Sequence, residues 1–184
     1  MNYKALTSAT ILLCLLYLLP ITAFSDDWTS MTSGTTNNLT TVWGTSGTDV
    51  FAVGANGTIL RYNGSDWSPM SSGTTNSLTG VWGASGADVF AVGANGTILH
   101  YNGSDWSPMT SGVTANTLFK VWGSSGNDVF AVGEIGIILH YNGSDWSPMS
   151  SGTSNGLSYV WGISGSDVFA VGESGLILHY NGSD

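Results

Sequence analysis

One position of a repeated sequence pattern carries the side chains best suited to metal or acid–base chemistry. It is occupied in successive repeats by Arg61, His100, His140 and His179. Imidazole nitrogens are common zinc ligands, so three histidines at one position suggest a zinc site. Each of them, however, lies on the third predicted strand of its own repeat, and strands spaced about 4.8 Å apart keep such positions from converging. We therefore predict packing or surface exposure for this position, and no metal site.

Aspartates recur at two further positions of the pattern. Paired carboxylates can hydrolyse glycosides, and clustered carboxylates can bind calcium. These aspartates stand beside predicted turns in every repeat, which favours a turn-capping role over catalysis or calcium binding. We predict no catalytic residue and no cofactor. The two sets are Asp49, Asp88, Asp128 and Asp167, and Asp66, Asp105, Asp145 and Asp184.

The charge balance excludes one class of partner. The 184 residues include 3 Lys plus Arg against 12 Asp plus Glu, a formal net charge of −9. A chain with so few cations cannot neutralise several phosphates, so nucleic acid is not expected as a partner. With 42% hydrophobic and only 8% charged residues, the composition is that of a folded protein.

The N-terminus has the features of a secretory signal peptide. Lys4 precedes an apolar run from Ala9 to Leu19, and Ala23-Phe24-Ser25 offers small residues for cleavage. We predict a signal peptide at residues 1–25 and a secreted domain at residues 26–184, with no membrane insertion after cleavage. The only cysteine, Cys14, would be removed, which excludes disulfides and thiolate sites from the mature chain.

Two series of tryptophans divide the rest of the chain into four repeats. A period near 40 residues is typical of repeat architectures. The units run from residue 28 to 66, 67 to 105, 106 to 145 and 146 to 184. The two series are Trp28, Trp67, Trp106 and Trp146, and Trp43, Trp82, Trp122 and Trp161.

Each unit predicts four short strands. In the first unit they are residues 39–44, 49–54, 57–62 and 66–70. Asn56-Gly57 and Asn63-Gly64 tolerate positive φ and can close tight hairpins. Pro69 lacks the N–H that a central strand donates, so the fourth strand belongs at a sheet edge.

Four-stranded units of this length predict an all-β protein, a β-propeller of four blades. The proline then marks the outermost strand, and the strand that starts at Leu39 is the innermost. Residues 28–31 would supply the missing outermost strand of the last blade, and pairing with residues 178–180 would close the ring. The alternative is an eight-bladed ring of two chains, so we expect a monomer or a homodimer.

The repeat motifs also resemble a known group of propellers. Each unit contains Leu-x-x-Val-Trp-Gly, then Asp-Val-Phe-Ala-Val-Gly, then Gly-x-Ile-Leu-x-Tyr-Asn-Gly-Ser-Asp. These motifs resemble bacterial secreted repeats related to Asp-box (sialidase-type) and photosystem II assembly-factor propellers, with a weaker likeness to tectonin-type lectin repeats. The resemblance covers residues 28–184 and implies the propeller fold, although residues 62–67 lack the Asp-x-Gly spacing of an Asp-box.

The sialidase activity that this resemblance suggests is not expected. Those enzymes hold a substrate carboxylate with several arginines, because the planar guanidinium binds carboxylates in a bidentate way. This chain has one arginine, Arg61. We therefore predict a protein that is not an enzyme.

A few positions differ between units, and they lie at one predicted face. The position before Val-Trp is Thr41, Gly80, Lys120 or Tyr159, and Phe119 precedes Lys120. The turn after the second strand gains Glu134 and Glu173 in the last two units. Variation on a constant scaffold is typical of a binding surface. The predicted ligand-binding residues are Phe119, Lys120, Tyr159, Glu134, Glu173 and Thr41.

The predicted function is a secreted binding module. Aromatic side chains can stack on sugars, so lectin-like carbohydrate recognition at the propeller face is our principal interpretation. The alternative is a protein-interaction scaffold in the cell envelope or extracellular space. The expected partner is accordingly a glycan or a protein.

Overall fold

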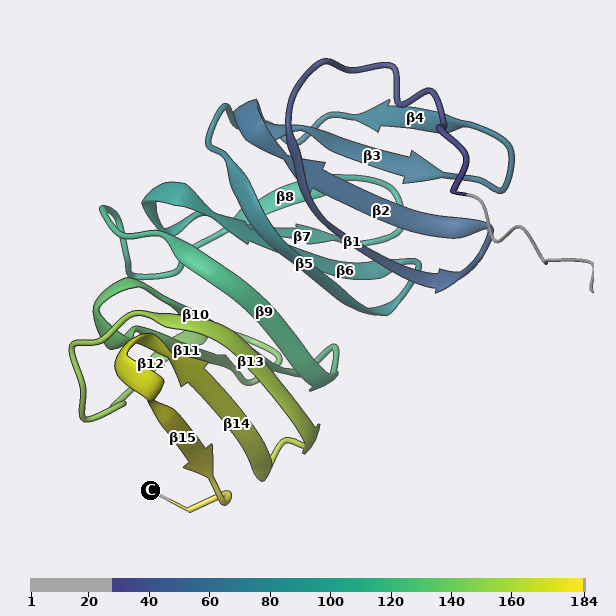
Figure 1. Ribbon diagram of the computed structural model, residues 1–184. Coiled ribbons are helices and arrows are strands. Elements are labelled where there is room, and N and C mark those ends of the chain that lie inside the picture. The colour runs from purple at the N-terminus through teal and green to yellow at the C-terminus, as the bar shows by residue number, and fades with distance from the viewer. Residues whose placement is uncertain (1–27, 184) are drawn as a thin grey trace, which may run out of the picture. The chain divides into compact units, whose positions relative to one another are not determined.

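The computed structural model describes residues 28–183, which form an all-β structure (Figure 1). The chain divides between Met31 and Thr32, and all fifteen strands described lie after that point. They pair antiparallel in four separate sheets, which confirms the predicted propeller fold with four blades. The predicted signal peptide at residues 1–25 lies outside the described residues. Within them, no helix is both long and apolar enough to cross a membrane.

Blade 1 shows the architecture that the others repeat. Its strands pair in chain order, with Trp43 opposite Phe51 and Phe51 opposite Arg61. A single 3-10 turn, η1, joins the second and third strands. The elements of blade 1 are β1 (Leu39–Ser46), β2 (Asp49–Gly54), η1 (Ala55–Gly57), β3 (Ile59–Tyr62) and β4 (Trp67–Met70).

Blades 2 and 3 have the same order and nearly the same lengths. Blade 2 contains β5 (Leu78–Ser85), β6 (Asp88–Gly93), η2 (Ala94–Gly96), β7 (Ile98–Tyr101) and β8 (Trp106–Met109). Blade 3 contains β9 (Leu118–Ser125), β10 (Asp128–Gly133), η3 (Glu134–Gly136), β11 (Ile138–Tyr141) and β12 (Trp146–Met149).

Blade 4 has three strands in the described residues. They are β13 (Leu157–Ser164), β14 (Asp167–Gly172) and β15 (Ile177–Tyr180), with η4 (Glu173–Gly175) after β14. Residues 28–31, the predicted partner of β15, form no strand here. Closure of the ring by this pairing stays a prediction.

The turn residues act as their chemistry predicts. Asn56 and Gly57 both have positive φ, at 55° and 67°. The Asn63 side chain accepts hydrogen bonds from the backbone N–H groups of Ser65 and Asp66, each at 2.9 Å. These local features close the hairpins between β2 and β3 and between β3 and β4.

The outermost strands contain the prolines of the described residues. Pro69, Pro108 and Pro148 occupy β4, β8 and β12, each at the edge of its sheet. The prediction of an edge strand is therefore confirmed. An edge position lets each strand contain proline because the missing N–H would have no partner there.

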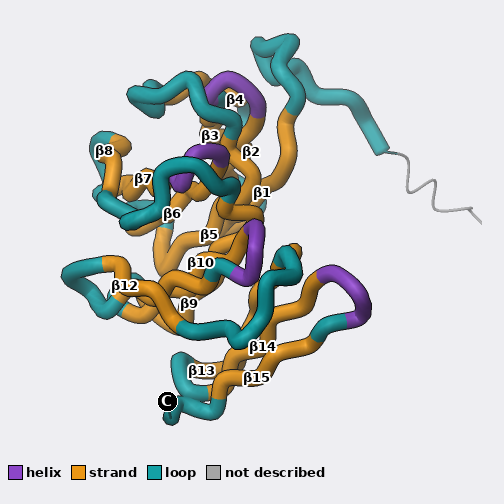
Figure 2. Tube along the Cα trace, turned by 90° about the vertical axis from the view of Figure 1, so that its left-hand side faces the viewer, coloured by secondary structure: helices purple, strands orange, loops and turns teal. Residues whose placement is uncertain are grey.

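The hydrophobic core lies between neighbouring blades. One cluster joins Phe51 and Val53 of blade 1 to Leu78, Val81 and other apolar side chains of blade 2, and two more clusters join the later pairs. The innermost strands also pack in sequence, β1 on β5, β5 on β9 and β9 on β13. Blades 1 and 4 therefore lie at opposite ends of the row of sheets (Figures 1 and 2).

Candidate functional site

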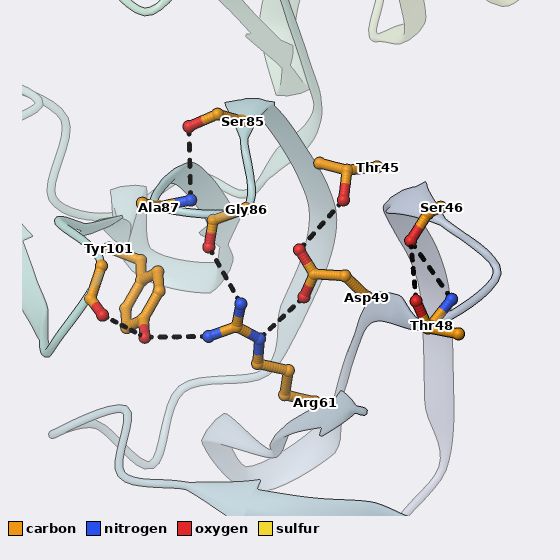
Figure 3. A network of polar contacts seen from close by, with 10 residues as sticks. Thr45, Ser46, Thr48, Asp49, Arg61, Ser85, Gly86, Ala87 and Tyr101 are labelled. Carbon is orange, nitrogen blue, oxygen red and sulfur yellow. Dashed lines mark hydrogen bonds and ion pairs between the residues drawn. The ribbon is translucent and has the colours of Figure 1, made fainter. Parts of the chain in front are cut away.

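Arg61, which stands where the other repeats have histidine, links blades 1 and 2. The Nε of Arg61 donates to Asp49 at 2.8 Å, and its other nitrogens donate to the Tyr101 hydroxyl at 3.2 Å and the Gly86 carbonyl at 3.3 Å (Figure 3). The hydrogen bond to Asp49 raises the pKa of Arg61 above its ordinary value, and partial desolvation opposes that rise. The bond to Asp49 lies within blade 1, and the bonds to Tyr101 and Gly86 cross to blade 2, so the side chain has a structural role.

The histidines at the same position pair with aspartates of their own blades. The Nε2 of His100 lies 2.7 Å from Asp88 Oδ1, and its ring stacks on Phe90 with the centroids 4.5 Å apart. The same pair forms between His140 and Asp128. Each aspartate of the series that begins with Asp49 thus pairs with the arginine or histidine of its own blade. These aspartates therefore do not serve only to cap turns, as we expected.

These histidines do not converge. In the part of the chain that the structure describes, no three His, Cys, Asp or Glu side chains are grouped closely enough to hold a metal ion. Each imidazole is instead held between a carboxylate and a phenyl ring of one blade.

A β-bulge sets the first variable position. In every blade the register of the innermost strand shifts by one residue near its start, leaving Phe119 unpaired between Leu118 and Lys120 in blade 3. In blade 1 the bulge residue is Thr40, whose hydroxyl donates to the Leu78 carbonyl of blade 2 at 2.6 Å. The bulge positions are Thr40, Thr79, Phe119 and Ser158.

Phe119 gives up a hydrogen bond between blades. Thr79 makes the same bond to the Leu118 carbonyl that Thr40 makes one blade earlier. A phenyl ring has no donor, so Phe119 cannot make the equivalent bond to Leu157. A half-buried aromatic ring thus replaces a polar link at this position of blade 3.

The second variable position brings two predicted residues together. The Lys120 ammonium lies 5.7 Å from the centre of the Tyr159 ring, across the boundary between blades 3 and 4. This is within the range of a cation–π interaction. The Tyr159 side chain is 52% exposed. Thr41 is half-buried at the equivalent position of blade 1, two blades before Lys120.

The two predicted glutamates bind the loops that precede the innermost strands. Glu134 accepts hydrogen bonds from the Thr117 backbone N–H at 3.0 Å and from the Asn116 side chain at 3.4 Å. Glu173 accepts from the Gly156 backbone N–H at 3.0 Å. The bond from Thr117 lowers the pKa of Glu134. One oxygen of each carboxylate is therefore engaged within its own blade.

The structure adds Ile135 to the candidate site. It follows Glu134 in η3, is 61% exposed, and has a φ of 48°. Asparagine and serine take this conformation in the other blades, but a β-branched residue does so at a cost. The signal in the sequence is an isoleucine at a position where the first two repeats have Asn56 and Asn95.

These residues share one end of their blades. The start of each innermost strand pairs with the end of the second strand, as Leu118 pairs with Gly133, so the loop before β9 and the turn η3 lie together. We call Phe119, Lys120, Ile135 and Tyr159 the inner-strand patch. Glu134 and Glu173 stand beside it as loop-binding residues.

Comparisons with known proteins show the fold. A scan against protein-family models and a search of curated proteins each find no match. A solved structure described as YCF48 bound to D1 peptide matches with a TM-score of 0.62 and 17% identity, over 78% of this chain and 49% of that one. YCF48 from Cyanidioschyzon merolae matches with a TM-score of 0.65 and 16% identity, over 83% and 52%.

A third solved structure broadens the comparison to another group of propellers. The C-terminal WD40 domain of Sif2 matches with a TM-score of 0.60 and 13% identity, over 82% of this chain and 45% of that one. The chain thus spans about half the length of the solved structures that it matches. At these identities the likeness concerns the fold alone, and it places the four sheets among β-propellers.

Proposed function

We propose that the protein is a non-enzymatic scaffold that binds a segment of another protein at the inner-strand patch. The observation that carries this proposal is Phe119, which replaces a hydroxyl that links neighbouring blades elsewhere. Ile135 breaks a second local preference at the same end of the same blade. Departures from locally favourable choices concentrate at functional sites, because selection for binding offsets their cost in stability.

The chemistry of the patch suits a peptide with an apolar anchor. Phe119, Ile135 and Tyr159 offer aromatic and aliphatic surface, which is typical of the residues that contribute most to protein interfaces. The net charge of −9 favours a partner segment that carries lysine or arginine, since the field of the whole chain would attract it.

Two considerations favour a protein partner over the glycan of our principal interpretation. Exposed Ile135 at the centre of the varying turn offers no hydrogen bond to a sugar hydroxyl. A propeller of similar fold is described as bound to D1 peptide, which supports a peptide as the kind of ligand. The predicted leader at residues 1–25 would place this scaffold outside the cytoplasm, and N-terminal sequencing of the exported chain tests that step.

Selection from a displayed random peptide library tests the function. We expect the purified protein to enrich peptides that combine an apolar anchor with basic residues. Phe119→Thr restores the residue type of the first two blades and should weaken binding at least about tenfold, the loss that about 1.4 kcal/mol of contact energy represents. Ile135→Asn should weaken it as well, because asparagine keeps the turn and removes the apolar side chain.

A matched control separates the patch from general surface effects. Asn95→Ala alters the position of blade 2 that corresponds to Ile135, and it should leave peptide affinity unchanged. A glycan array probed in parallel decides between the two partner classes. Binding to one sugar class with no enriched peptide would overturn the proposal in favour of a lectin.

A further inference from the structure

The interior blade boundaries share one packing contact. A tryptophan of each innermost strand covers a glycine of the next one, and a Cβ atom at Gly83 would lie only 2.6 Å from the Trp43 ring. The next two boundaries repeat this arrangement, with Trp82 over Gly123 and Trp122 over Gly162. Trp161 of blade 4 covers no glycine and is 51% exposed.

Blade 1 retains the other half of this contact. Gly44 holds the position of Gly83, and a Cβ there would meet only atoms of its own blade. Val42, which stands where buried Val81 stands in blade 2, is 63% exposed. The outer face of blade 1 is therefore an apolar surface shaped to receive an indole ring.

The aromatic contacts that join neighbouring blades are likewise incomplete at blades 1 and 4. Phe51 of blade 1 packs on Tyr101 and Trp106 of blade 2, at centroid distances of 5.7 and 6.1 Å. In blade 4 the equivalent Phe169 is 37% exposed, where Phe51 is fully buried. For Tyr62 of blade 1, at the position of Tyr101, the one aromatic contact in the described residues is with Trp67 of the same blade.

The loops at the boundaries follow this pattern as well. The Asp88 carboxylate fits against Gly126 of the next blade, and Asp128 fits against Gly165. Nothing lies within 4 Å of a Cβ built at Gly47, the corresponding glycine of blade 1. Asp167 is the aspartate of blade 4 without a following glycine to face.

A cavity lies where an outermost strand would pack on blade 4, which has three strands in the described residues. Its volume is about 540 Å³, and its lining includes Phe130, Leu178 and Tyr180. At the equivalent place one blade earlier, Trp146 packs on both Phe90 and Tyr141. The cavity therefore has the shape and chemistry of an indole site.

One candidate for this cavity is Trp28, whose side chain is fully exposed. Residues 28–31 are Trp-Thr-Ser-Met, and the outermost strands of the other blades are Trp-Ser-Pro-Met. In those blades the tryptophan pairs with the tyrosine of the third strand, as Trp146 does with Tyr141. The same register would place Trp28 opposite Tyr180 and Met31 opposite Ile177.

The two free faces do not meet within one chain. The three interior boundaries are alike, so each turns the next blade by a similar angle. After three such turns, blades 1 and 4 remain at opposite ends of the row (Figures 1 and 2), and their strands do not pack as neighbouring blades do. A ring built with this angle needs more than four blades.

We propose that two copies of the chain close one eight-bladed ring, in which blade 4 of each copy packs on blade 1 of the other. Propellers contain about four to eight blades, so two copies of the four sheets described here fit that range. The twofold symmetry forms both boundaries at once and leaves no free face. The strand formed by residues 28–31 of one copy completes the sheet of β15 in its partner.

Engineered disulfides test this arrangement directly. Asp167→Cys with Gly47→Cys places thiols at the proposed boundary, in a chain that also carries Cys14→Ser to remove the native cysteine. The control is Asp88→Cys with Gly126→Cys, where the Asp88 Cγ lies 2.9 Å from a Cβ built at Gly126. This separation suits a disulfide, so the control should link within one chain and prove that the geometry permits the bond.

The expected result is a covalent dimer of twice the chain mass for the Asp167→Cys, Gly47→Cys variant. The unmodified protein should likewise show twice the chain mass by native mass spectrometry at micromolar concentration. A disulfide that forms within one chain would overturn the proposal in favour of a four-bladed ring. Failure to link while the control links, or a monomeric native mass, would overturn it as well.

Discussion

Ile135 is the residue where local conformation and sequence disagree most. Its φ of 48° lies in the left-handed region, which costs an L-residue about 1–2 kcal/mol. We expect Ile135→Asn to raise the free energy of unfolding by about 1 kcal/mol, because asparagine adopts this conformation readily. Denaturant titration measures the change. The mirror substitution Asn95→Ile, in the same turn of blade 2, should destabilise by a similar amount, and an unchanged Ile135→Asn variant would contradict the strain.

Glu134 gives a prediction on pH. The Thr117 backbone N–H lowers the pKa of Glu134 from its ordinary value of 4.5. The bond therefore stabilises the folded loop at neutral pH, and that contribution disappears as the pH falls below about 4.5 through the lowered pKa. The amide shift of Thr117, followed by NMR, should titrate with a midpoint below 4.5.

Glu134→Gln is the control for this titration. The amide oxygen of glutamine still accepts the bond from Thr117, but it does not titrate in this range. The Thr117 signal should then stay constant with pH. A Thr117 shift that titrates equally in both variants would assign the change to another group.

At the scale of the strands and turns, the sequence alone predicts most of the blade. Pro69 predicts an edge strand and Asn56-Gly57 a turn of positive φ, and both predictions are confirmed because each depends on the local backbone alone. The partners of Asp49 and Asp88 could not be predicted in this way. Arg61 and His100 lie on the neighbouring strand, each opposite the residue two positions after its aspartate. Which side chains meet therefore depends on the register of the hairpin.

The candidate binding residues also differ in how far the sequence alone could predict them. The variable positions of the repeats indicated Phe119, Lys120 and Tyr159, and the structure brings Lys120 and Tyr159 within 5.7 Å. The engagement of Glu134 with the loop before β9 depends on a side-chain rotamer, which no repeat pattern reveals. Ile135 was visible as a change in the turn, but its significance depends on the φ of that turn.

The glycines of the 3-10 turns support the loops between blades. Gly96 has a φ of 62°, and a Cβ there would collide with the Val113 carbonyl. Gly112 has a similar φ of 74°, but nothing lies within 4 Å of its Cβ position. We expect Gly112→Ala to destabilise by about 1 kcal/mol from backbone strain alone. Gly96→Ala should cost about 1–3 kcal/mol more, because the loop must also move.

Thermal or denaturant unfolding of the two glycine variants measures this difference. Both positions lie in blade 2 and its exit loop, and both substitutions add one methyl group, so the comparison isolates the close approach. Equal losses would mean that the loop yields freely and that the turn does not support it.

At the scale of the whole molecule, the repeat explains why the ends are unsatisfied. Near-identical units make near-identical boundaries, so each blade carries one face for the blade before it and one for the blade after it. A row of such blades always ends in two complementary faces. Trp161 and Gly44 are the halves of one contact that the interior makes three times.

Concentration dependence of the stability follows from the proposed two-chain ring. Because association stabilises only the folded chains, the midpoint of thermal unfolding should rise with protein concentration.

Val42→Asp puts a charge on the free face of blade 1. Val42 is 63% exposed in the single chain, so there the change should alter stability by no more than about 0.5 kcal/mol. In the ring the carboxylate would be buried without a partner, so the variant should unfold at one temperature across all concentrations. Ser68→Asp adds the same charge on an exposed outermost strand and should keep the dependence. A midpoint that is constant for the unmodified protein from low to high micromolar concentration would argue that each chain satisfies its own end faces.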